Sequence, residues 1–215
     1  LESEIRVEVK ARTSNPAIEL LVEEGDKVSK GQVLLRLEND KQKNDHDQAL
    51  SQLEKTRIEY ERQENLYKDN LISEQIFRNA KFDLNQRQLS AETAQRQLEY
   101  TEVRAPIKGT ITLRSVKVGD NVSTGSTIFE IIDFESTVAV VHVPEQYLPQ
   151  LMPDMAARLI SNTLDDKIFP AHVKRISPIV EARAGTIKVT VGVNELGALR
   201  PGMWVDVELV LETKQ

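Results

Sequence analysis

The apolar positions of this chain change their period near residue 39 and change back near residue 100. Outside that stretch, short apolar runs alternate with polar residues and end at glycine, proline, asparagine or aspartate, a pattern typical of short antiparallel strands. Residues 39–100 contain neither glycine nor proline, and their apolar residues recur at helical spacing. The pattern predicts two antiparallel helices that form a hairpin, with one break at residues 69–73.

Both predicted helices repeat their apolar positions every three and four residues, which is typical of a two-stranded coiled coil. On the first helix the predicted seam is His46, Leu50, Leu53, Arg57, Tyr60, Glu64 and Tyr67; on the second it is Phe77, Ala80, Leu84, Arg87, Ala91, Ala94 and Leu98. If the turn is centred near Ile72, this register places Arg57 opposite Arg87, an unfavourable pair of like charges.

The segments that flank the hairpin are near copies of each other. Residues 22–31 read Val-Glu-Glu-Gly-Asp-Lys-Val-Ser-Lys-Gly, and residues 116–125 read Val-Lys-Val-Gly-Asp-Asn-Val-Ser-Thr-Gly. An internal repeat of this kind predicts a pseudo-symmetric β-sandwich cut in half by the hairpin. We expect glycines to occupy its tight turns and those nearby, because glycine adopts positive φ without strain. These structural turn residues are Gly25, Gly31, Gly109, Gly119, Gly125 and Gly202.

Several strands after residue 133 predict a small antiparallel β-barrel. They lie at 137–143, 157–160, 168–176, 186–194 and 203–211, with turns such as 162–166 and a short helix at 144–151. The N-terminal strand 4–10 is expected to join the barrel, because it has no evident partner in the sandwich. The fold class is therefore mostly β with a long α-helical hairpin. Its predicted domains are a sandwich at 11–38 and 101–133, a hairpin at 39–100, and a barrel at 1–10 and 134–212.

Composition and charge exclude several function classes. The net charge of −6 with no basic stripe argues against nucleic acid as a partner, and the absence of cysteine excludes disulfides and thiol chemistry. No phosphate loop, dinucleotide fingerprint, zinc motif or nucleophile elbow is present. The three histidines, His46, His142 and His172, are far apart in the sequence. We therefore predict a protein that is not an enzyme, with no catalytic, cofactor-binding or metal-binding residues.

The order of half-sandwich, hairpin, half-sandwich and barrel resembles the periplasmic adaptor proteins, also called membrane fusion proteins or the HlyD-like family. The matching segments are 22–34, then 103–111 (Val-Arg-Ala-Pro-Ile-Lys-Gly-Thr-Ile), then 199–205 (Leu-Arg-Pro-Gly-Met-Trp-Val). The split lipoyl-like sandwich also resembles biotin and lipoyl carrier domains. Those carry a modified lysine on the turn between the halves, and here the helices replace that turn, which argues against a carrier.

The resemblance implies an adaptor between an inner-membrane RND efflux transporter and an outer-membrane TolC-like duct, in export of drugs or other small toxic compounds. It implies a periplasmic protein that self-associates into a ring, a trimer or hexamer, and is anchored to the inner membrane at full length. The family's membrane-proximal domain is expected to be absent or truncated in this chain. Members that engage TolC-like ducts carry an arginine, a leucine and a serine at the hairpin tip, and the matching residues are Arg62, Leu66 and Ser73.

Two other functions remain open on the sequence. In the first, the protein belongs to the same family but serves as the adaptor of an ABC-type exporter or a secretion system. The modest length of the hairpin disfavours this function. The other is a coiled-coil scaffold without a transport role, which leaves the duplicated sandwich and the barrel without a purpose.

Overall fold

The computed structural model describes residues 1–164 and 167–210, and its chain divides into two compact units. One unit comprises Leu1–Val7, Ile107–Thr110 and Ile131–Gln215; the other comprises Glu8–Pro106 and Ile111–Glu130. Two parts of the predictions lie outside the described residues. One is the last two residues of the predicted turn at 162–166. The other is the end of the predicted barrel domain and of its last strand, from residue 211 on. The predicted domain boundaries stay a prediction.

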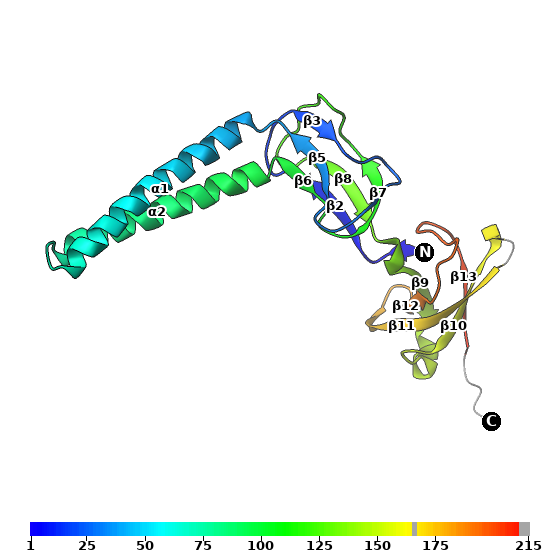
Figure 1. Cartoon of the computed structure of the whole chain (residues 1–215). Helices are drawn as coiled ribbons and strands as arrows, with labels where there is room; N and C mark the ends of the chain where they lie inside the picture. The colour runs from blue at the N-terminus through cyan, green and yellow to red at the C-terminus, as the bar shows by residue number, and fades with distance from the viewer. Residues whose placement is uncertain (165–166, 211–215) are drawn as a thin grey trace. The chain divides into compact units, whose positions relative to one another are not determined.

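The sandwich consists of two sheets that enclose an apolar core. Its strands are β2 (Arg6–Lys10), β8 (Thr127–Ile132), β7 (Gly109–Arg114) and β4 (Lys27–Val28) in one sheet, and β3 (Ala17–Leu20), β5 (Val33–Leu37) and β6 (Glu102–Arg104) in the other (Figure 1). The inward side chains of β5, β7 and β8 are almost fully buried; they are Leu34, Leu35, Leu37, Ile111, Ile128, Phe129 and Ile131.

The two copies of the repeat form the same pair of turns. Gly25 and Gly119 have φ of 95° and 93°, and Gly31 and Gly125 have φ of 86° and 87°. In each copy an aspartate carboxylate closes the first turn by accepting a hydrogen bond from the backbone N–H three residues before it, Asp26 from Glu23 and Asp120 from Lys117, both at 2.8 Å. The glycines and the aspartate that the two copies share thus form the same turns in both halves of the sandwich.

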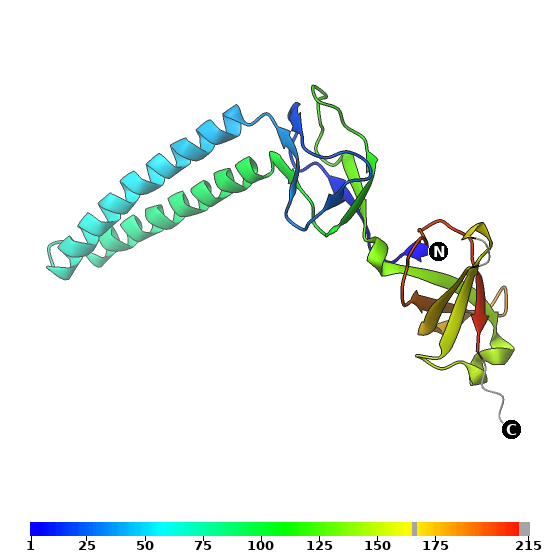
Figure 2. The same ribbon diagram turned by 45° about the vertical axis from the view of Figure 1, so that its right-hand side comes forward.

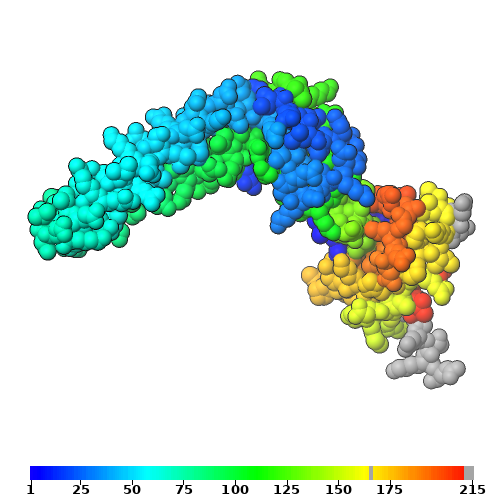
Figure 3. Space-filling view, viewed as in Figure 1, coloured from blue at the N-terminus to red at the C-terminus, as the bar shows by residue number. Residues whose placement is uncertain are grey.

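The hairpin consists of α1 (Asp40–Lys68) and α2 (Glu74–Glu99), which run side by side (Figures 1 and 2). The space-filling view shows them in contact, α1 in light blue to cyan beside α2 in green (Figure 3). On α2 the predicted seam is correct except at Arg87, which is exposed. On α1 it is wrong at two positions: Ala49 and Thr56 turn inward, whereas Leu50 is 44% exposed and Arg57 pairs along its own helix with Glu61 at 3.2 Å.

The barrel domain is built on a six-stranded antiparallel sheet. Its order is β1 (Glu2–Ser3), β9 (Thr137–Pro144), β12 (Thr186–Val193), β11 (Lys167–Glu181), β10 (Ala156–Ser161) and β13 (Asp206–Leu209). The core of the sheet contains Leu159, Phe169, Val173, Val189 and Val191, each at most 4% exposed. The predicted helix at 144–151 is a single 3-10 segment, Glu145–Gln150.

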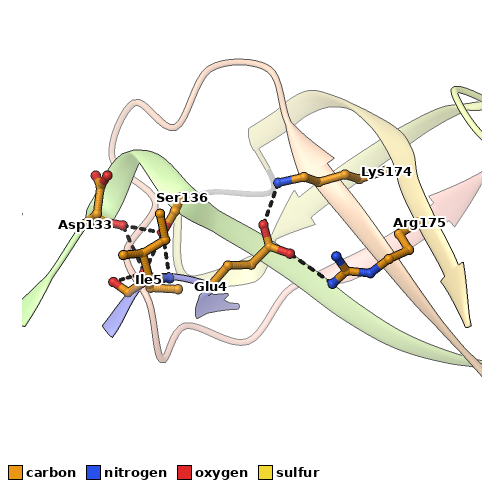
Figure 4. Close-up of polar contacts among 7 residues, drawn as sticks. Glu4, Ile5, Asp133, Ser136, Lys174 and Arg175 are labelled. Atoms are coloured by element: carbon orange, nitrogen blue, oxygen red, sulfur yellow. Dashed lines mark hydrogen bonds and ion pairs between the residues drawn. The ribbon is translucent and has the colours of Figure 1, made fainter. Parts of the chain in front are cut away.

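The expectation that the strand at 4–10 joins the barrel is wrong. The N-terminal segment forms two strands: β1 pairs with β9 of the barrel sheet, and β2 belongs to the sandwich sheet beside β8. Between them, the Glu4 carboxylate binds Arg175 at 3.0 Å and Lys174, and the Asp133 backbone N–H donates to the Ile5 carbonyl (Figure 4). The segment therefore changes sheets at Glu4 and Ile5. The alternation of polar and apolar residues in the sequence does not indicate this change.

Candidate partner-binding site at the hairpin tip

The turn between the helices is held by backbone hydrogen bonds and one left-handed residue. The N–H of Asn70 donates to the Tyr67 carbonyl at 3.0 Å, and that of Leu71 donates to the Leu66 carbonyl at 2.8 Å. Asn70 has φ of 58°, a conformation that asparagine tolerates better than most residues. Both contacts satisfy carbonyls that the end of α1 leaves without helical partners. The tip is thus an ordered turn.

Ser73 begins the second helix. Its backbone is extended, with φ of −74° and ψ of 154°, and its hydroxyl oxygen accepts a hydrogen bond from the Ile76 backbone N–H at 3.4 Å. This is the geometry of a helix N-cap. Glu74 follows in the first turn, where a carboxylate interacts favourably with the helix dipole. The side chain of Ser73 therefore has a structural task in this chain, whatever else it contacts.

Arg62 and Leu66 lie one turn apart on α1, on the same face of the helix. The Arg62 side chain is 66% exposed, and its guanidinium binds the Glu59 carboxylate at 2.7 Å. A hydrogen bond from the Gln63 amide, followed by the one from Arg62, holds the pKa of Glu59 below its usual range. Leu66 is half-buried. Among the described residues, no hydrogen bond links the Ser73 side chain to Arg62, so the three predicted residues share the tip without forming one polar cluster.

An aromatic cluster supports this tip from inside the hairpin. Phe77 of α2 packs against Tyr67 with ring centroids 4.8 Å apart and against Tyr60 with centroids 5.7 Å apart. The Tyr60 hydroxyl donates to the Glu64 carboxylate at 3.2 Å. Burial, with the Glu64 charge as a smaller cause, raises the pKa of Tyr60 above its usual value. The cluster fixes the positions of the two helix ends relative to each other.

Two apolar residues at the tip are exposed and were not among the predicted site residues. Leu71 is 68% exposed in the turn, and Ile76 is 47% exposed in the first part of α2. Ile76 precedes the seam residue Phe77, so the helical period turns it away from α1. That period is the one signal in the sequence for its exposure, whereas the exposure of Leu71 depends on the turn. The end of the hairpin thus exposes two apolar side chains in addition to the side chain of Arg62.

The described residues contain no other arrangement that indicates chemistry. No three histidine, aspartate or glutamate side chains among them are grouped so that they could hold a metal ion. His46 contacts Asp47 at 3.2 Å, and His172 contacts Asn194 at 2.8 Å. None of the helices in the described ranges combines the length and apolar character that a membrane crossing requires.

Two protein-family models match consecutive parts of the chain. The model described as "RND MFP, barrel-sandwich hybrid domain" matches residues 5–134, and the one described as "CusB-like, beta-barrel domain" matches residues 139–213. The first match alone covers more than half of the 215 residues.

Curated relatives match nearly the whole chain. The nodulation protein NolF of Rhizobium meliloti is 29% identical over 209 residues, which are 90% of this chain and 57% of NolF. The multidrug resistance protein MdtA of Escherichia coli (strain K12 / DH10B) is 26% identical over 232 residues, 97% of this chain and 56% of MdtA. The chain therefore spans about half the length of these relatives.

Solved structures share the fold. A MacA–MexA chimeric protein that contains the Pseudomonas aeruginosa MexA α-hairpin domain superimposes with a TM-score of 0.83 at 22% identity, covering 98% of this chain and 78% of the chimera. The membrane fusion protein Spr0693 from Streptococcus pneumoniae R6 superimposes with a TM-score of 0.72 at 20% identity, covering 97% of this chain and 99% of Spr0693.

Proposed function

Because this chain belongs to the RND membrane fusion protein family, we propose that it acts as a periplasmic adaptor between an inner-membrane RND transporter and an outer-membrane TolC-like duct. The observation that carries the proposal is the match of both family models, in order, to the sandwich with its hairpin and to the barrel. The family consists of non-enzymatic adaptors.

The cargo we propose is a drug or another small toxic compound. The support is the name of one relative, the multidrug resistance protein MdtA, which matches 97% of this chain. In this proposal several copies form a ring, a trimer or hexamer, and the full-length protein is anchored to the inner membrane. The ring gives the cargo a closed path between the two membranes.

We place the duct contact at the hairpin tip, on Arg62, Leu66 and Ser73. Arg62 supports this role because its side chain is mostly exposed and its guanidinium has donors left over after it binds Glu59. Leu66 supplies a half-buried apolar neighbour on the same face, and exposed Leu71 extends that apolar surface. An apolar knob beside a guanidinium fits a groove between helices, through packing and charge-assisted hydrogen bonds.

Substitution at the tip tests the proposal in cells. Leu66→Asp is expected to abolish resistance to the exported compounds, because a carboxylate cannot be desolvated in an apolar groove. Gln48→Asp, an exposed position on the same helix far from the tip, is the matched control and is expected to leave resistance unchanged. Minimal inhibitory concentrations, read together with protein levels and helix content, give the result. Unchanged resistance in a folded, normally expressed Leu66→Asp variant contradicts the tip contact.

A further inference from the structure

The hairpin leaves the sandwich through two short connections. Glu38 and Asn39 join β5 to α1, and Thr101 joins Tyr100, the C-cap residue of α2, to β6. Among the described elements, neither helix packs extensively against a strand, because the helices pack mainly against each other. Two connections define a hinge line, and rotation of the hairpin about this line is opposed by contacts that lie away from it. The contacts around the base of the hairpin therefore decide its direction on the sandwich.

One segment of the first half-sandwich, residues 12–16, contacts the connection to α1. The side-chain amide of Asn15 donates a hydrogen bond to the Glu38 carbonyl, and the Glu38 N–H donates to the Pro16 carbonyl at 2.8 Å. Asn39, which follows, makes no capping hydrogen bond with its own side chain. The start of α1 is therefore held by the neighbouring segment through Glu38 and not by a cap of its own.

The same segment also contacts the end of α2. The Arg12 guanidinium lies over the Tyr100 ring, 5.2 Å from its centroid, which is within the range of a cation–π interaction. Tyr100 is the C-cap residue of α2, and a positive charge interacts favourably with the C-terminal end of a helix dipole. Two features of this helix end, its ring and its dipole, thus favour the guanidinium at this place.

The segment is itself fixed to the second half of the sandwich. The Thr124 N–H donates to the Ser14 hydroxyl oxygen at 2.8 Å, and the Val122 N–H donates to the Asn15 carbonyl at 3.1 Å. Both donors belong to the second copy of the repeated sequence, at residues 116–125. Arg12 and Asn15 are therefore held on a support that is anchored to the sandwich independently of the hairpin.

We infer that residues 12–16 form a bracket that positions the hairpin, with Asn15 at the start of α1 and Arg12 at the end of α2. The inference rests on the adaptor role proposed above, because the direction of the hairpin decides where its tip meets the duct. Helix α1 has 29 residues and is about 43 Å long, so a rotation of about 10° at the base moves the tip by about 7 Å. A shift of this size breaks every hydrogen bond at the tip.

Distances between two spin labels test the bracket, because none of the 215 residues is a cysteine. Lys27→Cys in the sandwich and Lys55→Cys on α1 are exposed label sites in one compact unit of the chain. With these labels, Arg12→Ala is expected to raise the fraction of molecules outside the wild-type distance peak about threefold, because an exposed cation–π contact is lost. Lys10→Ala removes an exposed cation two residues away. It is the matched control and is expected to leave the distribution unchanged.

Further substitutions identify the contact that Arg12 makes. Tyr100→Phe keeps the ring and is expected to keep the wild-type distribution, whereas Tyr100→Leu is expected to broaden it as Arg12→Ala does. Because both substitutions remove the same contact, the double variant Arg12→Ala/Tyr100→Leu is expected to be no broader than either single variant. Asn15→Ala removes a different contact, so the double variant Arg12→Ala/Asn15→Ala is expected to be broader than Arg12→Ala alone.

A second pair of labels separates a change of direction from a loss of structure. Lys41→Cys and Lys55→Cys both lie on α1, about 21 Å apart along the helix, and their distance is expected to stay the same in every variant. Broadening of this second distance as well indicates a disordered hairpin and overturns the positioning role. An unchanged sandwich-to-hairpin distribution in Arg12→Ala, or a double variant with Tyr100→Leu that is broader than both single variants, overturns the bracket.

Resistance in cells connects the bracket to export. The double variant Arg12→Ala/Asn15→Ala is expected to lose resistance although its tip residues are intact, and Lys10→Ala is expected to keep it. A broadened distribution with normal resistance contradicts the positioning role and leaves the adaptor role standing. Normal resistance in Leu66→Asp contradicts the tip contact instead, and the distance measurements, which need no duct, then still decide whether the bracket holds the hairpin.

Discussion

Tyr67 and Phe77 stack face to face across the hairpin, with ring centroids 4.8 Å apart and ring planes 2° from parallel. Tyr67 belongs to the last turn of α1, and Phe77 to the first turns of α2. Because Phe77 also contacts Tyr60, one side chain of α2 joins two residues of α1 that are about two helical turns apart. The tip turn therefore rests on an aromatic cluster that closes the coiled coil at its far end.

Phe77→Ala is expected to destabilise the hairpin by about 2 kcal/mol, below the value for a fully buried phenylalanine because Phe77 is half-buried. Helix content followed by circular dichroism during thermal unfolding measures this. Phe82→Ala is the control: it removes the same ring from an exposed position, so its effect on the isolated chain is expected to be much smaller. Equal losses from both substitutions contradict the aromatic cluster as the closure of the hairpin.

Ser73 has a capping role that can be separated from the proposed duct contact. Ser73→Ala removes one of the two acceptors of the Ile76 N–H, the hydroxyl at 3.4 Å, and leaves the Ser73 carbonyl at 3.1 Å, so it is expected to destabilise the hairpin by at most about 1 kcal/mol. Ser73→Asp keeps a capping oxygen, so its hairpin is expected to unfold like the wild type. If Ser73 also contacts the duct, Ser73→Asp loses resistance in cells despite normal unfolding. Normal resistance in the Ser73→Asp variant indicates that Ser73 caps the helix and does not contact the duct.

The turns of the sandwich could be predicted from the sequence because their determinants are local. Gly25 and Asp26 recur as Gly119 and Asp120, and in both copies the glycine takes positive φ while the aspartate closes the turn. A few neighbouring residues determine such a turn, so equal short sequences give equal geometry.

The seam of α1 could not be predicted at every position, because two registers of the same heptad compete. Hydrophobicity favoured Leu50 over Ala49, but the structure turns Ala49 and Thr56 inward and leaves Leu50 exposed. Small side chains at the seam let the helices approach, and the tip turn fixes which of the two registers is used. The predicted opposition of Arg57 and Arg87 does not arise: Arg57 pairs with Glu61, and Arg87 lies beside Gln52.

The candidate site could be predicted in part. The turn follows from the break in the helical pattern, and Arg62, Leu66 and Ser73 came from the family resemblance. The exposure of Leu71 was not predictable, because it depends on the left-handed Asn70 and on the hydrogen bond from Leu71 to Leu66. The role of the site in binding a duct stays a prediction.

The contact between Glu4 and β11 predicts a dependence of barrel stability on pH. The hydrogen bond from Lys174, with smaller contributions from Arg175, lowers the pKa of Glu4 below its usual range. A carboxyl whose folded pKa is lowered stabilises the fold above its unfolded pKa of about 4.3, and this stabilisation is lost as the pH falls through the lower folded value. Glu4→Gln is therefore expected to lower the melting temperature at pH 7 and to lower it by less near pH 3.

Glu2→Gln provides the control for that comparison. Glu2 is exposed and lies two residues away on the same N-terminal segment, so its substitution is expected to leave the melting temperature unchanged at both values of pH. Because the Glu4 pair is partly exposed, 0.5 M salt is expected to reduce the effect of Glu4→Gln. An effect of the same size at pH 7 and pH 3 contradicts an electrostatic role for Glu4.

Substitution by alanine is expected to lower the free energy of unfolding by different amounts at Gly109 and at Gly119. A Cβ on Gly109 would lie 2.6 Å from the Ile132 carbonyl oxygen and 2.8 Å from the Ile131 side chain, whereas a Cβ on Gly119 meets nothing within 4 Å. Gly119→Ala is then expected to cost about 1–2 kcal/mol, from its φ of 93° alone. Gly109→Ala, with φ of 159°, is expected to cost more, because β7 must separate from β8 to relieve a contact with backbone atoms. Thermal and denaturant unfolding of both variants measures the difference, and a Gly109→Ala variant as stable as Gly119→Ala contradicts the close packing of these strands.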